Sequence, residues 1–129
     1  MRSAVFCLLT LALTTPPGFA AEHTKDTPEE VKKALADKKA VLIDVRELKE
    51  WDEGHLKDAE LLALSRIKAG VPQAELDKKL PKGKIVYVHC RSGGRSLTAA
   101  DLLAKKGYDV RALEKGYEDL VKAGFPKAD

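Results

Sequence analysis

The chain has 129 residues, which is the usual length of one domain. Hydrophobic residues make up 44% and charged residues 33% of it, as in a soluble globular protein and unlike a disordered or fibrous chain. The 23 Lys and Arg residues only slightly outnumber the 20 Asp and Glu residues, and the charges are evenly spread. This balance argues against nucleic-acid binding.

The N-terminus has the three-part layout of a secretory signal peptide. Arg2 is the only charged residue before Glu22, and residues 5–13 form a short apolar stretch. Gly18 and Ala20 are small residues at the two positions that a signal peptidase inspects. The alternative is a buried N-terminal helix.

We therefore predict a signal peptide over 1–20, a short segment over 21–26 and the folded domain over 27–129. The predicted location is periplasmic or secreted, with no membrane attachment after cleavage. Cleavage also removes Cys7 and leaves Cys90 as a lone cysteine in a compartment where thiols normally pair. Such a thiol is either a buried residue present by chance or a reactive group.

The folded part opens with a capping box, Thr27-Pro28-Glu29-Glu30. Apolar runs at 41–43 and 85–88 are typical of buried strands. Strands without polar alternation, separated by helices, indicate a parallel sheet with helices on both faces, and the fold class is α/β. We predict helices over 28–37, 47–53, 72–80, 96–106 and 117–123, and strands over 41–44, 59–64, 85–88 and 108–113.

Cys90 lies between a predicted buried strand and a predicted helix, where open α/β sheets bind ligands. Gly93 and Gly94 allow the backbone to curl and turn its N–H groups toward one point, an anion-binding arrangement that the helix N-terminus reinforces. Arg91 and Arg95 add positive charge, which favours a thiolate. The alternative, a buried structural cysteine beside a glycine turn, requires neither arginine.

Residues 88–96, Val-His-Cys-Arg-Ser-Gly-Gly-Arg-Ser, resemble the active-site loop of single-domain rhodaneses. Three further segments resemble motifs of that family in the expected order: Ile43–Arg46, Trp51–Leu56 and Leu113–Tyr117. The likeness runs from about Pro28 to Pro126 and is greatest to the small periplasmic rhodaneses.

The resemblance implies a rhodanese-like domain and a two-step transfer of sulfur without a cofactor. A small-molecule donor such as thiosulfate would leave a persulfide on Cys90, and a small acceptor, cyanide or a thiol, would remove it. We expect a monomer. The residues expected to bind the anionic substrate are Arg91, Ser92, Gly93, Gly94 and Arg95, and those expected to support the site are Asp44, Arg46 and Ser96.

Within the loop, Arg91 would attract the sulfonate end of the donor. Arg95 is either a second electrostatic contributor or a structural clamp on Asp44 or another acid. Strand alternation turns His89 away from the cysteine, so a packing role is expected for it. With three histidines and one remaining cysteine, we expect no metal site.

Two other functions remain open. The active-site loops of cysteine phosphatases and arsenate reductases resemble this segment. Those loops have five residues between cysteine and arginine, whereas this chain has four between Cys90 and Arg95. The shorter loop suits a single sulfur atom. A persulfide carrier that depends on a partner protein would need the same loop as an enzyme.

Export should remove the first 20 residues, because the apolar stretch ends at Gly18-Phe19-Ala20. The intact mass of protein recovered from a secreting host is then expected to correspond to a chain starting at Ala21. A mature form that retains Met1 would contradict both the signal peptide and the predicted location.

Overall fold

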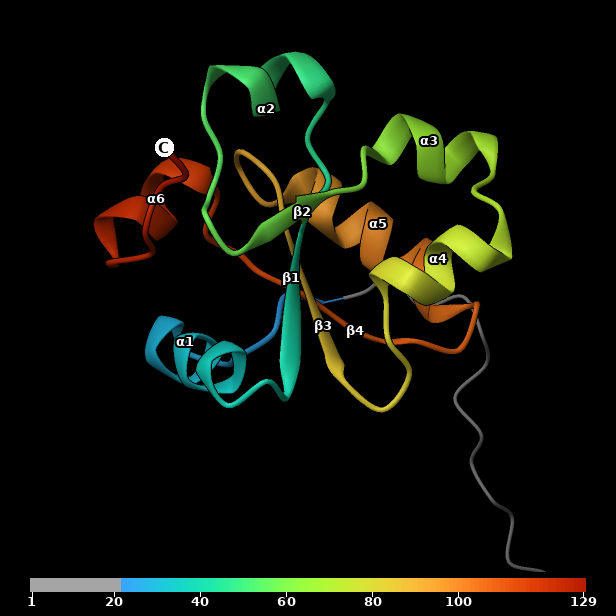
Figure 1. Ribbon diagram of the computed structural model, residues 1–129, viewed down its shortest axis with the longest axis horizontal. Helices are drawn as coiled ribbons and strands as arrows, with labels where there is room; N and C mark the ends of the chain where they lie inside the picture. The colour runs from blue at the N-terminus through green and yellow to red at the C-terminus, as the bar shows by residue number, and fades with distance from the viewer. Residues whose placement is uncertain (1–21) are drawn as a thin grey trace, which may run out of the picture.

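The computed structural model describes residues 22–129 (Figure 1), so the predicted signal peptide over 1–20 lies outside the described residues. Four strands form one parallel sheet in the order β2-β1-β3-β4. The strands are β1 (Ala40–Asp44), β2 (Ala59–Leu61), β3 (Ile85–His89) and β4 (Asp109–Ala112). The helices are α1 (Pro28–Ala36), α2 (Leu48–Glu53), α3 (Leu64–Ala69), α4 (Gln73–Lys79), α5 (Gly94–Ala104) and α6 (Tyr117–Lys122).

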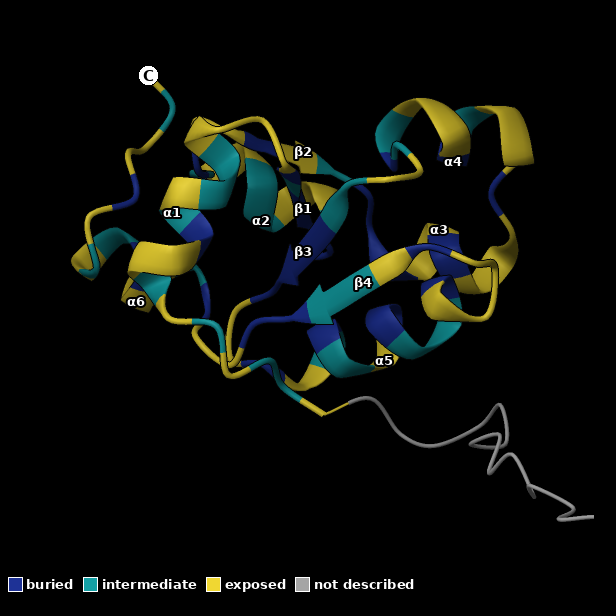
Figure 2. Ribbon diagram, turned by 90° about the horizontal axis from the view of Figure 1, so that it is seen from below, coloured by how far each residue is buried: buried dark blue, intermediate teal, exposed yellow. Residues whose placement is uncertain are grey.

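Helices cover both faces of the sheet, as the apolar strands predicted. Figure 1 shows α1 and α6 on one side and α3, α4 and α5 on the other. Ile43, Val88 and Leu103 belong to the core cluster on the α5 side, while Leu42 and Tyr87 belong to the cluster on the opposite side. Burial of aliphatic side chains of this size contributes about 1.5–3 kcal/mol each. In Figure 2, β1 and β3 are largely buried and the helices expose only their outer sides.

The expectation of a strand over 59–64 is wrong in its second half. Strand β2 ends at Leu61, and the chain then turns into α3, a helix that the apolar run did not suggest. Leu64 and Ile67, three residues apart, are buried on the inner face of α3, and Gly70 follows the helix at a φ of +103°. A short apolar run followed by one buried helical turn looks like a single strand from the sequence alone.

Helix α5 begins at Gly94, two residues before the predicted start. Gly93 precedes it in the left-handed conformation, with a φ of +95°, and this turn brings the chain directly into the helix. Consequently Gly94 and Arg95 belong to the first turn of α5 and not to a free loop.

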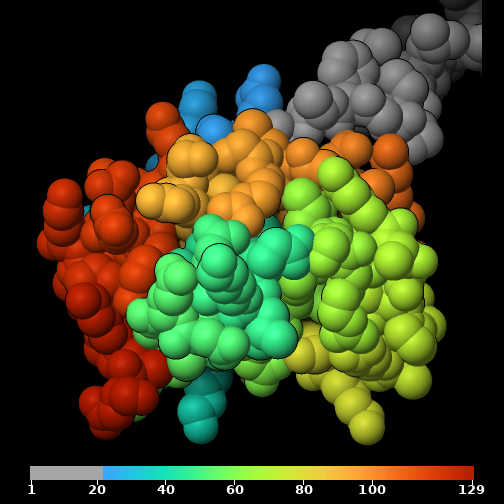
Figure 3. Space-filling view, turned by 90° about the horizontal axis from the view of Figure 1, so that it is seen from above, coloured from blue at the N-terminus to red at the C-terminus, as the bar shows by residue number. Residues whose placement is uncertain are grey.

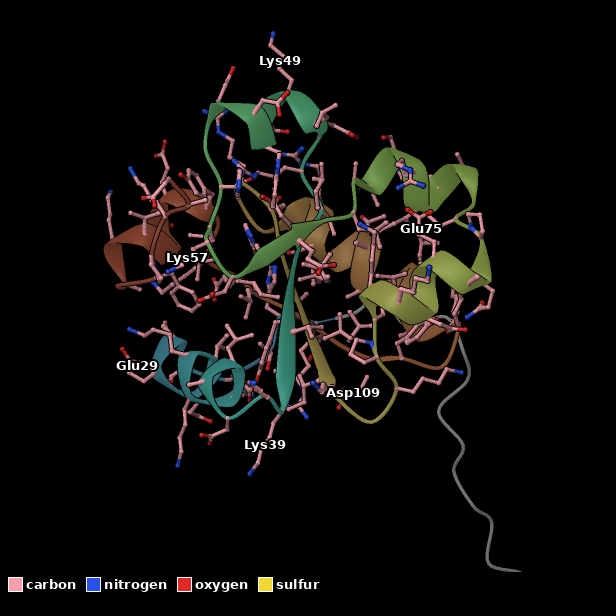
Figure 4. The ribbon with its side chains drawn as sticks, in the orientation of Figure 1. Glu29, Lys39, Lys49, Lys57, Glu75 and Asp109 are labelled. Atoms are coloured by element: carbon pink, nitrogen blue, oxygen red, sulfur yellow. The ribbon has the colours of Figure 1, made fainter. Side chains whose placement is uncertain are left out.

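The carboxyl ends of the parallel strands lie at one end of the molecule. Because Asp44 pairs in register with His89, the residues after β1 and β3 meet there. Figure 3 looks onto this end, where the gold and orange segment after β3 lies between α2 in green, the red C-terminal segment and α3 in lime. In Figure 4, Lys49 of α2 extends from this end and Lys39 from the opposite end. No helix of the described chain is long and apolar enough to cross a bilayer.

Candidate active site

The segment Cys90–Arg95, here called the Cys90 loop, curls around a sulfur atom that is removed from solvent. Cys90 has no exposed surface and belongs to the apolar cluster on the α5 side of the sheet. The N–H of Gly93 points to the sulfur, with a distance of 3.0 Å between nitrogen and Sγ. The loop therefore provides a hydrogen-bond donor to a buried sulfur at the point where strand and helix meet.

A side chain at Gly93 would disturb this arrangement in two ways. Its φ of +95° is a conformation that L-residues with a Cβ rarely adopt. A Cβ would also lie 2.8 Å from the carbonyl oxygen of Glu114. The glycine is thus required both for the turn and for close packing against the segment after β4.

The segment after β4 supports the loop from behind. The Tyr117 N–H donates to the carbonyl oxygen of Cys90 at 2.9 Å. A Cβ on Gly116 would collide with the carbonyl group of Arg91, so the two backbones are in direct contact. These contacts give a physical role to a glycine-tyrosine pair that the sequence singled out only as a family motif.

Asp44 and Arg46, both expected to support the site, form an internal ion pair. The guanidinium Nε and Nη2 lie 2.8–3.0 Å from the carboxylate oxygens, and both side chains are buried. Nη2 also donates to the carbonyl of Gly54, and the guanidinium lies 4.4 Å from the centroid of the Tyr117 ring. The pair therefore connects β1, the end of α2 and the residue that binds the Cys90 carbonyl.

His89 has the packing role expected from strand alternation. It is fully buried on the side of Asp44, with 3.8 Å between its Nε2 and the nearer carboxylate oxygen. Its Nδ1 lies 3.3 Å from the carbonyl oxygen of Cys90, so the ring contacts the backbone of Cys90 and not its sulfur. Burial lowers the pKa of His89 more than the Asp44 carboxylate raises it, which favours a neutral ring. Within residues 22–129, Nε2 has no hydrogen-bond partner.

Arg95 is a clamp on an acid, and the acid is Glu50 of α2 and not Asp44. Two parallel hydrogen bonds of 2.6 and 2.9 Å join the guanidinium to the carboxylate. These bonds are the main reason why the pKa of Glu50 falls to about 2 and that of Arg95 rises. A smaller coulombic contribution from Cys90 also raises the pKa of Arg95.

The sequence did not reveal Glu50 as part of the site. It is one of four acidic residues between 47 and 53, and its partner is 45 positions away. A pattern of acids on a short helix is typical of a solvated surface, and nothing in it identifies the residue that turns toward the loop.

Arg91 and Ser92 are exposed at the rim of the site. A cavity of about 230 Å³ lies beside Arg91, and its lining includes Glu53 and Glu118. Within the described residues the Arg91 side chain has no hydrogen bond or ion pair, so its charge is available to a ligand in the cavity. Residues 22–129 contain no group of three or more His, Cys, Asp or Glu residues that could hold a metal ion.

Ser96 lies on the inner side of the loop and is fully buried. Its hydroxyl lies 2.8 Å from the carbonyl oxygen of Gly93 and 3.1 Å from that of Leu113. The structure thus brings the Gly93 N–H to the Cys90 sulfur and Ser96 to the Gly93 carbonyl, with Arg95 held by Glu50 and Arg91 exposed.

Replacing Glu50 with glutamine should destabilise the protein by about 1 kcal/mol at pH 7, because it removes the carboxylate from Arg95. The pKa of Glu50 is about 2 in the folded protein, against 4.5 for an ordinary glutamate. This stabilisation is therefore complete above about pH 4.5 and is lost as the pH falls toward 2. Urea unfolding of the wild type and Glu50→Gln at pH 7 and pH 3 measures the difference.

Glu75→Gln is the matched control, since Glu75 pairs with Arg66 in the same two-bond geometry on the outer surface of α3 and α4. Its effect should be smaller than that of Glu50→Gln. Equal losses in both variants, or a loss at Glu50 that does not shrink at pH 3, would contradict a special contribution from the Glu50–Arg95 pair.

The family model for the rhodanese-like domain matches residues 27–123. The thiosulfate sulfurtransferase GlpE of Pseudomonas savastanoi pv. phaseolicola is 34% identical over 103 residues, which cover 79% of this chain and 91% of that protein. The probable adenylyltransferase/sulfurtransferase MoeZ of Mycobacterium tuberculosis is 36% identical over 90 residues, or 69% of this chain. The chain spans only 22% of the length of MoeZ.

Among solved structures, the human single-domain sulfurtransferase TSTD1 has the same fold. It superposes with a TM-score of 0.64 and covers 81% of this chain and 97% of its own length, at 23% identity. At that identity the likeness supports the fold alone. The family match, in contrast, extends over most of the chain and includes the whole Cys90 loop. The chain therefore belongs to the family of rhodanese-like domains, as its resemblance to rhodaneses predicted.

Proposed function

We propose that this protein transfers sulfane sulfur from a donor such as thiosulfate to a thiophilic acceptor, cyanide or a thiol, through a persulfide on Cys90. The observation that carries the proposal is the Gly93 N–H directed at a buried cysteine sulfur. The names of similar proteins support the same reaction, since GlpE is a thiosulfate sulfurtransferase.

The reaction needs two nucleophilic displacements and no external oxidant or reductant. In the first, the Cys90 thiolate attacks the outer sulfur of thiosulfate, the bond between its two sulfur atoms breaks, and sulfite leaves with the electron pair. In the second, the acceptor attacks the outer sulfur of the persulfide, and the thiolate is released. With cyanide as acceptor, the product is thiocyanate.

The loop suits the charge that this reaction places on sulfur. Thiolate and persulfide are both anions, and a positioned N–H donor stabilises such charge where water is excluded. Arg91, exposed and free of partners within the described chain, is placed to attract the sulfonate end of the donor. Arg95 is already held by Glu50, and its role is to keep the first turn of α5 in place beside the sulfur.

Replacing Cys90 with serine should abolish sulfur transfer, because a serine hydroxyl is not ionised at neutral pH. Wild-type protein treated with thiosulfate is expected to gain the mass of one sulfur atom and to lose it on addition of cyanide. The Cys90→Ser protein should gain none and should keep the circular dichroism of the wild type. Comparable thiocyanate production by the two proteins would rule out the mechanism.

The size of the loop separates this proposal from a phosphatase or an arsenate reductase. The loop has four residues between Cys90 and Arg95, one fewer than in those enzymes, and its Gly93 nitrogen lies 3.0 Å from the sulfur, so it offers less space for the oxygens of a phosphoryl group. The protein should therefore hydrolyse no aryl phosphate above background and should leave arsenate unreduced in the presence of thiols. Efficient phosphate-ester hydrolysis without persulfide formation would overturn the proposal.

A glycine inserted between Gly93 and Gly94 tests whether sulfur transfer depends on the short loop. The insertion restores the five-residue spacing from Cys90 to Arg95 that phosphatases have, and it moves the amide away from the sulfur. Thiosulfate turnover should be lost. Turnover at the wild-type rate would show that the short loop is not what binds the sulfur.

A further inference from the structure

We infer that His23, which precedes the part of the chain matched by the rhodanese-like family model, is a positioning residue of the sulfur site. The inference rests on the proposed function. It adds the N-terminal segment to a site so far built from the Cys90 loop, α2 and the segment after β4. In Figure 3, the first described residues, drawn in blue, border the gold and orange Cys90 loop.

The N-terminal segment is held firmly against β4. His23 forms a parallel bridge with Ala112, and the Thr24 N–H donates to the Ala112 carbonyl at 2.8 Å. Asp26 accepts hydrogen bonds from the Tyr87 hydroxyl at 2.6 Å and from Arg111 at 2.8 Å. These two bonds are the main cause of a lowered pKa at Asp26. The backbone at the histidine and after it is therefore held against β4.

The ring reaches the Cys90 loop. Nε2 of His23 lies 2.8 Å from the carbonyl oxygen of Gly93. Gly93 is also the residue whose N–H faces the sulfur. A carbonyl oxygen can only accept, so the hydrogen of this bond is on Nε2 of the histidine. The loop thus receives a hydrogen bond from a residue 70 positions earlier in the sequence.

Ser96 alone cannot satisfy this carbonyl. Its hydroxyl is within hydrogen-bond distance of two carbonyl oxygens, those of Gly93 and Leu113, but it has a single hydrogen to donate. The bond from His23 provides the Gly93 oxygen with a donor of its own. Without it, the Ser96 hydroxyl would be the one side-chain donor for both carbonyls within the described residues, and an under-paired buried polar group is costly.

The carbonyl of Gly93 matters because the peptide between Gly93 and Gly94 is planar. Fixing its oxygen fixes the plane, and with it the direction of the Gly94 N–H at the start of α5. Gly93 lacks a Cβ and adopts many backbone conformations when it is not held. By restraining this plane, His23 and Ser96 fix ψ of Gly93 at −16° and limit the rotations about its Cα that would turn its N–H away from Cys90.

The test compares His23→Ala, which removes the donor, with His23→Gln, which places an amide N–H near the position of Nε2. In His23→Ala, the half-life of the Cys90 persulfide in the absence of acceptor and the kcat for thiosulfate:cyanide turnover should both fall about three- to tenfold. The KM for thiosulfate should change little, since Arg91 is untouched. His23→Gln should recover most of the loss.

Lys25→Ala is the matched control, because Lys25 is exposed on the same segment and its side chain makes no hydrogen bond within the described residues. It should behave as the wild type. Amide hydrogen exchange gives a readout that does not depend on activity: the Gly93 and Gly94 N–H groups should exchange faster in His23→Ala, while the β3 amides keep their protection.

The outcomes separate the two proposals. If the wild type forms no persulfide, the proposed function is wrong. If it does, but His23→Ala matches it in persulfide half-life and kcat, the inference about His23 alone is wrong. A loss in His23→Ala that His23→Gln does not recover would also overturn the inference, since it would show that the residue acts by packing and not as a hydrogen-bond donor.

Discussion

The Cys90 sulfur lies among apolar side chains, and within the described chain the group that hydrogen-bonds to it is the Gly93 N–H, 3.0 Å away. An anion in such surroundings is unstable unless polar groups that stay in place take over from water. The site therefore depends on a single flexible residue, Gly93, holding one conformation. Most of the other contacts around the loop restrain that conformation from outside.

The restraints come from segments that are distant in sequence and are brought together by the parallel sheet. Tyr117, which follows β4, binds the Cys90 carbonyl, and Glu50, which follows β1, binds Arg95 on the first turn of α5. Arg46 joins these two sides, since it pairs with Asp44 and lies over the Tyr117 ring. Because parallel strands place their carboxyl ends at one end of the sheet, the segments after β1 and β4 can each restrain the loop after β3.

How far the sequence predicted these features depends on how local they are. The Cys90 loop and the opposite orientations of Cys90 and His89 follow from neighbouring residues and from strand alternation, and both were predictable. The partner of Arg95 was not, because four acids lie within 47–53 and the choice among them depends on how α2 packs. Helix α3 was missed because its two buried residues, Leu64 and Ile67, are too few to show a helical period, and Leu64 continues the apolar run of β2.

The two arginines of the loop have separate electrostatic roles. Glu50 neutralises Arg95, so Arg91 is the loop arginine without an ion partner within the described residues, while Glu53 and Glu118 line the cavity beside it. In the proposed reaction, the sulfonate oxygens of thiosulfate would lie at Arg91 while its outer sulfur approaches Cys90. The charge pattern and the short loop thus favour the same proposed substrate, a small anion that enters the site sulfur first.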